Sequence, residues 1–336
     1  MKTPGFWYRP AGATARLLAP AGWLYGAAGW LRGRVTTPVR VGIPVACVGN
    51  LVAGGAGKTP VALALGAVMA GLPSPGPTVH FVTRGYGGRL RGPLAVDASV
   101  HDAAAVGDEA LLLAEAAPTW VSADRVAGAR AAVAAGASAI VLDDGFQNPC
   151  LHKDVSLVVV DGGAGTGNGC LVPAGPLREP VGRGLARADA VVILGEDRMG
   201  VEAKVAGRRP VLHARLVPDA TACELDGRRV VAFAGLARPA KFFGTLEELG
   251  AVIVEAVPFP DHHPFQPIEL SRLAGLAERH GAELVTTAKD AVRLPPELRA
   301  LVRTVRVAVA WRDPGALERV LAPLVRKAKS TAGHGA

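Results

Sequence analysis

The sequence predicts an α/β protein in which a doubly wound parallel sheet is followed by a second, smaller α/β domain. Three observations lead to this prediction. A β-branched segment runs into a glycine-rich turn and a helical stretch within residues 45–65, short apolar segments then alternate with helical segments, and this alternation restarts near residue 228. Strands separated by helical segments are typical of parallel sheets with helices on both faces.

Residues 1–35 are expected to form an apolar segment at a membrane surface. Residues 17–31 carry no charge, but this run is too short to span a bilayer, which needs about 20 apolar residues. A helix beginning near Pro20 would place four apolar residues on one face, namely Trp23, Leu24, Trp30 and Leu31. Arginines on both sides of the run would suit anionic headgroups. An ordinary core helix explains the pattern equally well, and a signal peptide is a further alternative.

The glycine-rich turn has the features of a phosphate-binding loop. Glycines let backbone N–H groups surround phosphate oxygens, a lysine neutralises the β/γ charge, and a hydroxyl reaches Mg²⁺. The match to G-x-x-x-x-G-K-[ST] has one departure, because Val52 stands at the first position. A chance glycine turn is the alternative, but the preceding strand and the following helix oppose it. We therefore expect a P-loop NTPase-like fold that binds a nucleoside triphosphate and Mg²⁺ through Gly54, Gly55, Ala56, Gly57, Lys58, Thr59 and Pro60.

The first domain is expected to cover residues 36–218. After the loop, its strands are expected within residues 78–88, 119–123, 138–147, 154–162 and 189–195. Its helices are expected within residues 108–117 and 124–136. The second domain, residues 219–328, begins close to Pro218. Its strands are expected within residues 228–236, 251–259, 282–290 and 302–311, and its helices within 239–250, 267–281 and 314–328. Residues 329–336 are expected to be a disordered tail.

Composition limits the classes of partner. The chain has 336 residues, 50% hydrophobic and 20% charged, which indicates a globular protein with a large core. A net charge of +8 suits a phosphate-rich partner, either a nucleotide, a nucleic acid or an anionic membrane. The basic residues are scattered without interleaved aromatics, so we expect no nucleic-acid partner. The cysteines form no C-x-x-C pair, which indicates a reducing cytosol: Cys47, Cys150, Cys170 and Cys223.

Acidic residues stand where strands and helices meet. Asp143 ends a buried strand and would lie beside the phosphate loop, where a carboxylate can hold Mg²⁺ or its waters. Asp144, which follows it, could bind metal or orient the acceptor, although an Asp-Asp-Gly turn is also ordinary loop chemistry. Asp108 and Glu109 begin a helix, where the macrodipole alone favours acidic side chains.

Other polar residues could have either a structural or a functional role. The string "FPDHHPF" places Asp261, His262 and His263 together; a metal site lacks a third ligand at a useful spacing, and Asp-His adjacency suits a catalytic dyad. The strings "TRGYGG" and "PAGPLREP" place four more polar residues at a strand end and in a proline-framed loop, namely Arg84, Tyr86, Arg178 and Glu179.

Taken together, these strings resemble one family. The ordered set "VGNLVAGGAGKTP", "TRGYGG", "GDEALLLA", "SADR", "LDDGFQN", "GNGCLVPAGPLREP", "AFAGLARPAKFF", "FPDHHPF" and "TTAKDAVRL" is similar to the motifs of the tetraacyldisaccharide 4′-kinases of lipid A biosynthesis. The resemblance runs from about residue 40 to residue 294, and the apolar N-terminal segment also fits. "DDGFQ" and "PAGPLREP" are its most specific strings.

The resemblance implies a Mg²⁺- and ATP-dependent lipid kinase. Such an enzyme phosphorylates the 4′-hydroxyl of an acylated glucosamine disaccharide 1-phosphate to form lipid IVA, as a peripheral protein at the cytoplasmic face of the inner membrane. Two domains would close over the nucleotide, and no obligate protein partner is evident. The implied catalytic residues are Asp108, His262 and Lys58, and the implied metal ligands are Thr59, Asp143 and Asp144. The expected substrate-contacting residues are Arg84, Tyr86, Glu109, Arg125, Gln147, Arg178 and Glu179.

The sequence departs from the family pattern in places, and two rival functions explain it less well. Thr83 replaces a usual serine, Asn148 a common histidine, and residues 161–170 lack an expected arginine and phenylalanine. A deviant P-loop ATPase switch acting on a protein partner would need a lysine at Ala53 and has no use for the "DHHPF" domain. A soluble small-molecule kinase would leave the tryptophan-rich N-terminal segment unexplained.

Overall fold

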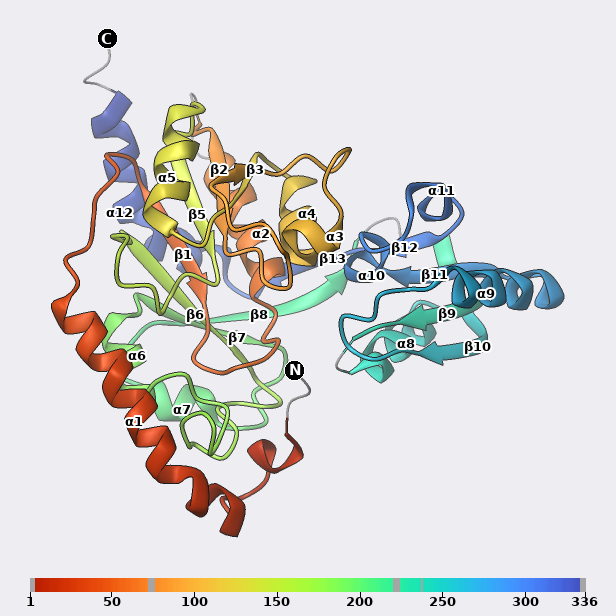
Figure 1. The fold of residues 1–336 in the computed structure, drawn as a ribbon, viewed down its shortest axis with the longest axis horizontal. Helices are drawn as coiled ribbons and strands as arrows, with labels where there is room; N and C mark the ends of the chain where they lie inside the picture. Colours follow the sequence, from red (N-terminus) through yellow and green to blue (C-terminus); the bar gives the residue numbers. More distant parts are fainter. Residues whose placement is uncertain (1–3, 72–75, 220–223, 237, 333–336) are drawn as a thin grey trace.

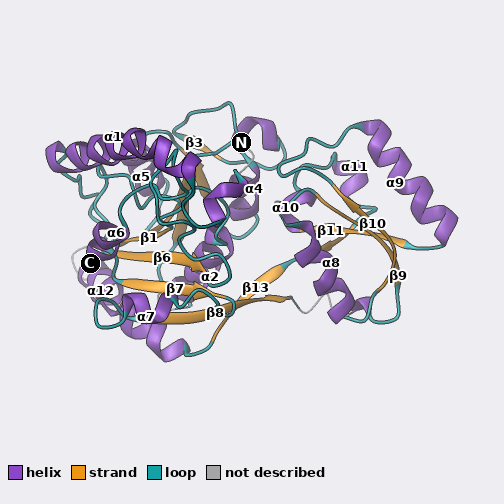
Figure 2. Cartoon of the chain, turned by 90° about the horizontal axis from the view of Figure 1, so that it is seen from below, coloured by secondary structure: helices purple, strands orange, loops and turns teal. Residues whose placement is uncertain are grey.

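The computed structural model describes residues 4–71, 76–219, 224–236 and 238–332. Cys223 and residues 333–336 of the expected tail therefore lie outside the described residues. Figure 1 shows a larger body that carries most of the chain, including its C-terminal helix, and a smaller body formed by a stretch between about residues 224 and 306. Long strands of the larger body reach toward the smaller one, as both views show (Figures 1 and 2).

The larger body is built on a sheet in the order β13-β8-β7-β6-β1-β5-β2-β4-β3. Neighbouring strands are parallel except for the two edge pairs, β13 with β8 and β3 with β4. The strands are β1 (Val45–Gly49), β2 (Val79–Thr83), β3 (Leu94–Ala95), β4 (Thr119–Val121), β5 (Ala139–Asp143), β6 (Val155–Asp161), β7 (Ala190–Leu194), β8 (Val211–Pro218) and β13 (Val307–Trp311). The central strands read as continuous apolar runs because both of their faces are buried.

Helices cover both faces of this sheet, which confirms the predicted doubly wound fold. One face packs against α2 (Lys58–Ala70), α4 (Asp108–Ala114) and α12 (Pro314–Ala332). The other face packs against α5 (Arg125–Ala134), α6 (Val181–Arg187) and α7 (Val201–Val205). Alternate residues of β1 serve the two layers, since Val48 joins the first and Cys47 the second. A short helix, α3 (Ala103–Val106), precedes α4.

The smaller body has its own parallel sheet in the order β10-β9-β11-β12. Its strands are β9 (Arg229–Ala234), β10 (Val252–Pro258), β11 (Glu283–Thr287) and β12 (Arg303–Val305). Apolar residues of α8 (Pro239–Glu248) pack on one face and those of α9 (Pro267–His280) on the other. Two short helices, α10 (Ala288–Ala291) and α11 (Pro296–Arg299), follow β11. The smaller body is therefore a three-layer α/β unit with a separate core.

The C-terminal segment does not stay in the smaller body, which corrects the expected boundaries of the second domain. Residues 302–311 form two strands in different sheets, because β12 pairs with β11 whereas β13 pairs antiparallel with β8. The helix α12 then returns to the larger sheet and continues to residue 332, through part of the expected tail. Its apolar residues fall at helical spacing and are buried there: Leu317, Leu321 and Leu324. This face would be exposed on the smaller sheet, whose two faces α8 and α9 already cover.

The N-terminal helix lies along the outside of the larger body (Figure 1). After a short turn of 3-10 helix, η1 (Gly5–Tyr8), α1 runs over Ala13–Val35. It therefore begins well before Pro20, which sits inside it. Close packing explains its course, since a Cβ added at Gly22 would lie 3.0 Å from the carbonyl oxygen of Leu171. Among the described residues no helix has both the length and the apolar character needed to cross a membrane.

Candidate active site

The glycine-rich loop connects β1 to α2 at the carboxyl edge of the larger sheet. Gly57 has a φ of 75°, and a Cβ there would lie 2.3 Å from a methyl carbon of Leu194, so only glycine fits. Lys58 is the first residue of α2, and its Nζ donates to the carbonyl oxygen of Gly54 at 3.5 Å. The free backbone N–H groups at the start of α2 thus face the loop, an arrangement that binds phosphate oxygens.

Asp143 ends β5 and lies directly beside this loop. Its Oδ2 accepts a hydrogen bond from Thr59 Oγ1 at 3.0 Å, whereas its Oδ1 is buried and has no partner among the described residues. Burial raises the pKa of Asp143 to about 7, against the opposing effect of Lys58. A buried carboxylate oxygen without a partner, next to a hydroxyl and a phosphate loop, fits Mg²⁺, which takes one or two protein oxygens and fills its shell with phosphates and water.

Asp144 links the loop to the proline-framed segment. It adopts a φ of 54°, a conformation that is uncommon for residues other than glycine and that often marks functional sites. Its Oδ1 accepts a hydrogen bond from Arg178 Nη1 at 2.8 Å, and its Oδ2 lies 3.8 Å from Lys58 Nζ. Burial opposes ionisation, but Lys58 and Arg178 outweigh it and hold the pKa of Asp144 below its usual value.

Gln147 and Glu179 extend this network away from Asp144. Gln147 Nε2 donates to Glu179 Oε1 at 3.0 Å and to the carbonyl oxygen of Asn50 at 2.8 Å. Arg187 Nη2 donates to the same Glu179 oxygen at 2.6 Å. Both predicted residues are therefore held by protein partners, and the network fixes the segment that carries Arg178.

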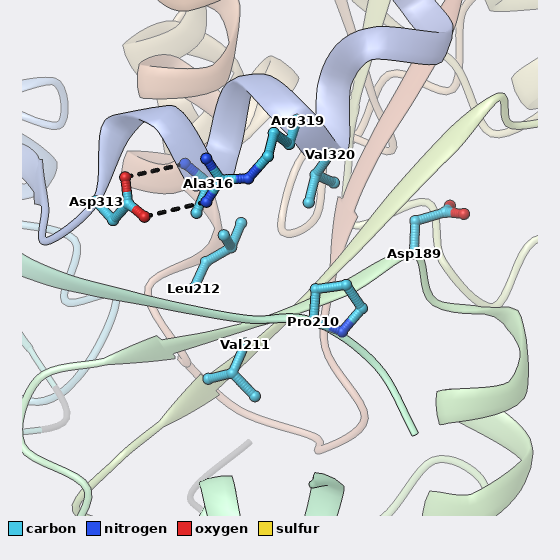
Figure 3. A pocket seen from close by; sticks show the side chains of 8 residues that line it. All are labelled: Asp189, Pro210, Val211, Leu212, Asp313, Ala316, Arg319 and Val320. Atoms are coloured by element: carbon cyan, nitrogen blue, oxygen red, sulfur yellow. Dashed lines mark hydrogen bonds and ion pairs between the residues drawn. The ribbon is translucent and has the colours of Figure 1, made fainter. Parts of the chain in front are cut away.

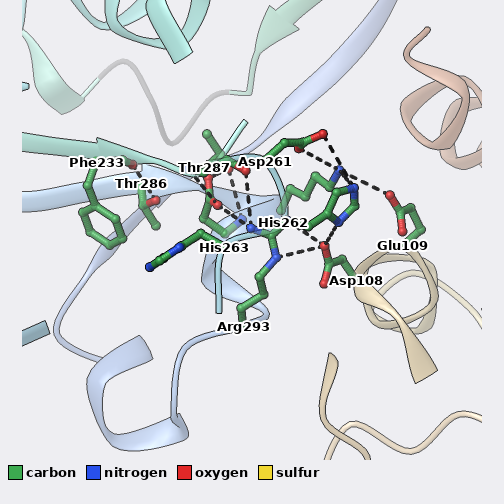
Figure 4. A network of polar contacts seen from close by, with 12 residues as sticks. Asp108, Glu109, Phe233, Asp261, His262, His263, Thr286, Thr287 and Arg293 are labelled. Atoms are coloured by element: carbon green, nitrogen blue, oxygen red, sulfur yellow. Dashed lines mark hydrogen bonds and ion pairs between the residues drawn. The ribbon is translucent and has the colours of Figure 1, made fainter. Parts of the chain in front are cut away.

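A second cluster joins the two bodies where they meet. Asp108, the first residue of α4, is buried, and its Oδ2 lies 2.8 Å from Nδ1 of His262 in the smaller body. His262 also adopts an unusual backbone conformation, with a φ of 57°. Figure 4 shows His262 and Arg293 converging on Asp108. The predicted dyad residues, separated by 154 positions in the sequence, are thus in hydrogen-bond contact.

The protonation of His262 follows from its neighbours. Its Nε2 lies 3.1 Å from Lys289 Nζ, which can only donate, so Nε2 accepts and Nδ1 carries the proton donated to Asp108. Lys289 also pairs with Glu109 Oε1 at 3.4 Å. Neighbouring His263 turns the other way and pairs with Glu269 of α9 at 2.8 Å. Of the two histidines, His262 is therefore the one that contacts the larger body.

The remaining predicted residues surround these two clusters. Tyr86 is exposed, with its ring edge toward His262 at a centroid distance of 6.3 Å. Arg125 is buried, and its Nη1 donates to the carbonyl oxygen of Ser122 at 2.7 Å. Exposed Arg84 is close enough to lower the pKa of Arg125, although burial lowers it more. Glu109 pairs with Lys289 and, although burial has the larger effect on both, is also near enough to Lys58 and Asp143 to raise the pKa of each slightly, so it lies between the two clusters.

Sequence reasoning missed several residues that the fold brings into this site. Asn50 is fully buried beside the loop, and Lys289 and Arg293 reach the acidic pair of α4 from the smaller body. The last two lie in the string "TTAKDAVRL", four residues apart as on one helical face, which is too common a spacing to reveal a role. Their contacts depend on how the two bodies meet.

A separate hollow lies far from these residues. It has a volume of about 540 Å³ and is lined at the amino ends of β7 and β8 and along α12 (Figure 3). In it, Arg319 pairs with Asp313 at 3.2 Å. Because β1, β6, β7 and β8 are parallel, this hollow is at the opposite edge of the sheet from the phosphate loop. Ligands of open α/β sheets bind at the carboxyl edge, so the loop side is the candidate site.

Comparison with known proteins agrees with this geometry. The family model described as tetraacyldisaccharide-1-P 4′-kinase matches residues 14–326. The chain belongs to this family. A tetraacyldisaccharide 4′-kinase of Rhodospirillum centenum is 58% identical over 331 residues, covering 97% of each chain. One of Gluconacetobacter diazotrophicus is 55% identical over 331 residues, covering 98% of this chain and all of the relative.

A solved structure shares the whole architecture. The crystal structure of the "apo" form of LpxK from Aquifex aeolicus in complex with ATP superimposes with a TM-score of 0.75. It is 26% identical and covers 92% of this chain and 99% of its own. The predicted family and the P-loop NTPase-like α/β fold are therefore confirmed.

Proposed function

We propose that the interdomain cluster is where this family member transfers the γ-phosphate of ATP to the 4′-hydroxyl of its tetraacyldisaccharide 1-phosphate substrate. The chain is an ATP-dependent kinase of lipid A biosynthesis by its family. The observation that carries the proposed site is the contact of Asp108 with His262 at 2.8 Å. It supports a role for Asp108 as a carboxylate base that a histidine of the other body orients.

The nucleotide side of the site uses charge and backbone donors. We assign Gly54, Gly55, Ala56, Gly57 and Pro60 to the loop that surrounds the phosphates, and Lys58 to neutralising their charge. Thr59 and Asp143 would hold Mg²⁺, with Asp144 beside it, and a bound Mg²⁺ would offset charge on the phosphate oxygens. The unpaired Oδ1 of Asp143 and its raised pKa support this assignment.

The acceptor side uses the Asp108–His262 pair. As the acceptor oxygen forms its bond to the γ-phosphorus, the bond from that phosphorus to the β–γ bridging oxygen breaks and ADP leaves. The hydroxyl proton passes to Asp108, which His262 orients. Because the pair forms only where the two bodies meet, transfer needs the two bodies in contact. This requirement limits attack of water on ATP. Arg84, Tyr86, Glu109 and Arg125 would contact the substrates around it, and Gln147, Arg178 and Glu179 would position the loop side.

We also propose that α1 holds the protein at an anionic membrane surface, the cytoplasmic face of the inner membrane, where the lipid acceptor would be. Large apolar side chains of α1 are exposed, including Trp23 at 70% and Leu24 at 74%. Arg32 and Arg34 lie in its last turn. Aromatic and aliphatic residues next to arginines are typical of helices that lie in the headgroup region.

One assay tests the proposed reaction. The protein is incubated with γ-labelled ATP and Mg²⁺, with and without acylated glucosamine disaccharide 1-phosphate in mixed micelles. We expect lipid-dependent transfer of label, greatly reduced but still measurable in Asp108→Asn. Release of labelled phosphate that a protein partner stimulates, without labelled lipid, would instead indicate an ATPase switch and overturn the proposal.

A further inference from the structure

Arg293 is a buried cation that the proposed mechanism has not used. Its side chain is 5% exposed, although it belongs to the smaller body and reaches across to α4 of the larger one. Its Nε and Nη2 donate to the same oxygen of Asp108, Oδ2, at 2.9 and 2.6 Å. A buried guanidinium with two donors on one carboxylate oxygen makes a strong, directional contact.

The smaller body holds this guanidinium in place. Arg293 Nη1 donates to Asp290 Oδ1 at 2.9 Å and to the carbonyl oxygen of Gly235 at 3.4 Å. Asp290 is fully buried and is itself fixed by Thr287 Oγ1 at 2.6 Å and by the backbone N–H of Gly235 at 3.0 Å. Arg293 is therefore presented to Asp108 in a fixed orientation when the two bodies meet.

These contacts divide the two oxygens of Asp108. Oδ2 receives three donors, two from Arg293 and one from His262. Within the described part of the chain, Oδ1 accepts no hydrogen bond from a side chain. One oxygen is thus anchored, and the other is left to accept a proton.

We propose that Arg293 is a positioning residue for phosphoryl transfer, which orients ionised Asp108 through Oδ2 so that Oδ1 receives the proton of the acceptor hydroxyl. This inference rests on the proposed function. Because Arg293 and Asp108 belong to different bodies, Arg293 can orient Asp108 only when the two bodies are in contact. Arg293 touches neither substrate nor nucleotide in this scheme and acts only through Asp108.

The charges around Asp108 predict a pH signature. His262 and Arg293 contact it directly, while Glu109 follows it on α4 and Lys289, Asp261 and Asp290 surround it from the smaller body. Burial alone would raise the pKa of Asp108, but the bonds from His262 and Arg293 outweigh burial and lower it to about 2. Without the guanidinium, burial has a larger relative effect and the pKa of Asp108 rises. Asp108 then becomes protonated, and no longer acts as a base, at a higher pH than in the wild type.

The test compares Arg293→Gln and Arg293→Lys with a matched control, Arg303→Gln. Arg303 is in the same body and also pairs with two carboxylates, Glu283 and Glu224, but not with Asp108. Transfer to the lipid acceptor is measured from pH 4.5 to 9, with melting temperatures for every variant. For Arg293→Gln we expect kcat to fall roughly 10- to 100-fold at pH 7, with a much smaller change in the KM for ATP. The acidic limb of kcat should move up by roughly 1 to 3 pH units, and Arg293→Lys should recover part of both effects.

A double-mutant cycle separates positioning from folding. If Arg293 acts only through Asp108, adding Arg293→Gln to Asp108→Asn should reduce kcat little further. Two results would overturn the inference. The first is an unchanged pH profile in Arg293→Gln. The second is a loss of kcat on Arg293→Gln that is equally large in the wild-type protein and in Asp108→Asn. If the wild-type protein itself transferred no phosphate to the lipid, the proposed function would fail instead, so the two failures are distinguishable.

Discussion

At the residue scale, several buried polar atoms of the site have no hydrogen-bond partner among the described residues. They are Asn50 Oδ1, Glu109 Oε2, Arg125 Nε and Asp143 Oδ1. Each such atom costs about 1–3 kcal/mol of stability when it is left unpaired. Their concentration around the phosphate loop indicates a site that its ligands complete, because stability alone would favour pairing or replacing these groups.

Replacement of Lys58 tests the nucleotide assignment. Lys58→Ala removes the cation next to the expected phosphates, so we expect kcat to fall by roughly 10²-fold or more. The matched control is Lys204→Ala, because Lys204 is an exposed residue of α7 whose Nζ donates to the carbonyl oxygen of Met199. Steady-state transfer with both variants is the measurement, and near-normal turnover in Lys58→Ala would show that this loop is not the catalytic one.

Asp143 predicts a pH-dependent stability. Its pKa is raised by burial to about 7 in the folded protein, whereas an unfolded aspartate has a pKa of about 3.9. Between these values the folded state binds the additional proton, so the ligand-free protein should lose stability as pH rises from about 4 to about 7. Asparagine does not titrate, so Asp143→Asn should melt a few degrees above wild type at pH 8, a shift on the order of 2–4 °C per kcal/mol, and near wild type at pH 4.

Calorimetry in the presence of a chelator measures this difference. The control is the variant Asp189→Asn. Asp189 lies at the opposite edge of the sheet, where its Oδ2 accepts a hydrogen bond from the backbone nitrogen of Ser156 at 2.7 Å. Identical pH dependence of melting in Asp143→Asn and wild type would contradict the raised pKa.

At the scale of elements, α1 has a packed side and an exposed side. Gly22 lies against Leu171, and Trp7, just before the helix, is buried and donates from Nε1 to the carbonyl oxygen of Pro173 at 3.1 Å. Deleting residues 1–35 would therefore also disturb the loop that leads to Arg178. Substitutions on the exposed side test membrane binding without removing these contacts.

The double variant Trp23→Ser/Leu24→Ser should weaken association with anionic vesicles and raise the KM for the lipid acceptor. We expect this effect because the variant buries less apolar surface in the membrane, and such burial stabilises binding by about 25 cal/mol for each Å². Arg32→Glu/Arg34→Glu should act in the same direction more mildly, as should high salt on the wild type. Ile268→Ser is the control, because Ile268 is 79% exposed on the smaller body. Equal loss of binding in all variants, measured by vesicle sedimentation, would contradict the proposed surface.

At the scale of the whole molecule, three sets of ion pairs join the two bodies within the part of the chain that the structure describes. The first is the Asp108 and Glu109 cluster. In the second, Asp161 at the end of β6 pairs with Arg238. Near the connecting strands, Glu115 pairs with Arg306. Because the last two pairs are separate from the proposed reacting groups, we expect them to hold the two bodies together without taking part in the chemistry.

Removing those two pairs should favour an open molecule. Exposed ion pairs contribute about 0.2–1 kcal/mol each, so Asp161→Asn/Glu115→Gln should reduce the closed-to-open ratio by roughly 2- to 30-fold. Small-angle scattering should show a larger radius of gyration, and kcat should fall while the melting temperature of each body changes little. The control Glu196→Gln removes a pair that lies within the larger body, with Arg198. An unchanged radius of gyration would contradict the role of these pairs.

Local patterns were enough for much of the fold and part of the site. Apolar runs and glycine turns located most strands and helices of the two sheets, because both depend on neighbouring residues. The strand β5 delivering Asp143 to the phosphate loop was predictable for the same reason, since parallel strands end at one edge. The pairing of Asp108 with His262 came from the family resemblance, because 154 residues separate them.

Tertiary structure alone decided what depends on long-range packing. The sequence determined a P-loop α/β protein with a second α/β unit, since periodicity and turn chemistry act within a few residues. It did not determine that β13 and α12 return to the larger sheet, because their apolar patterns would suit either body. The larger body is selected in the folded protein, where β13 pairs with the edge of β8 and the apolar side of α12 covers one face of the sheet. Nor did it reveal Arg293, whose role exists only where two separately folded bodies meet and a buried guanidinium finds its carboxylate.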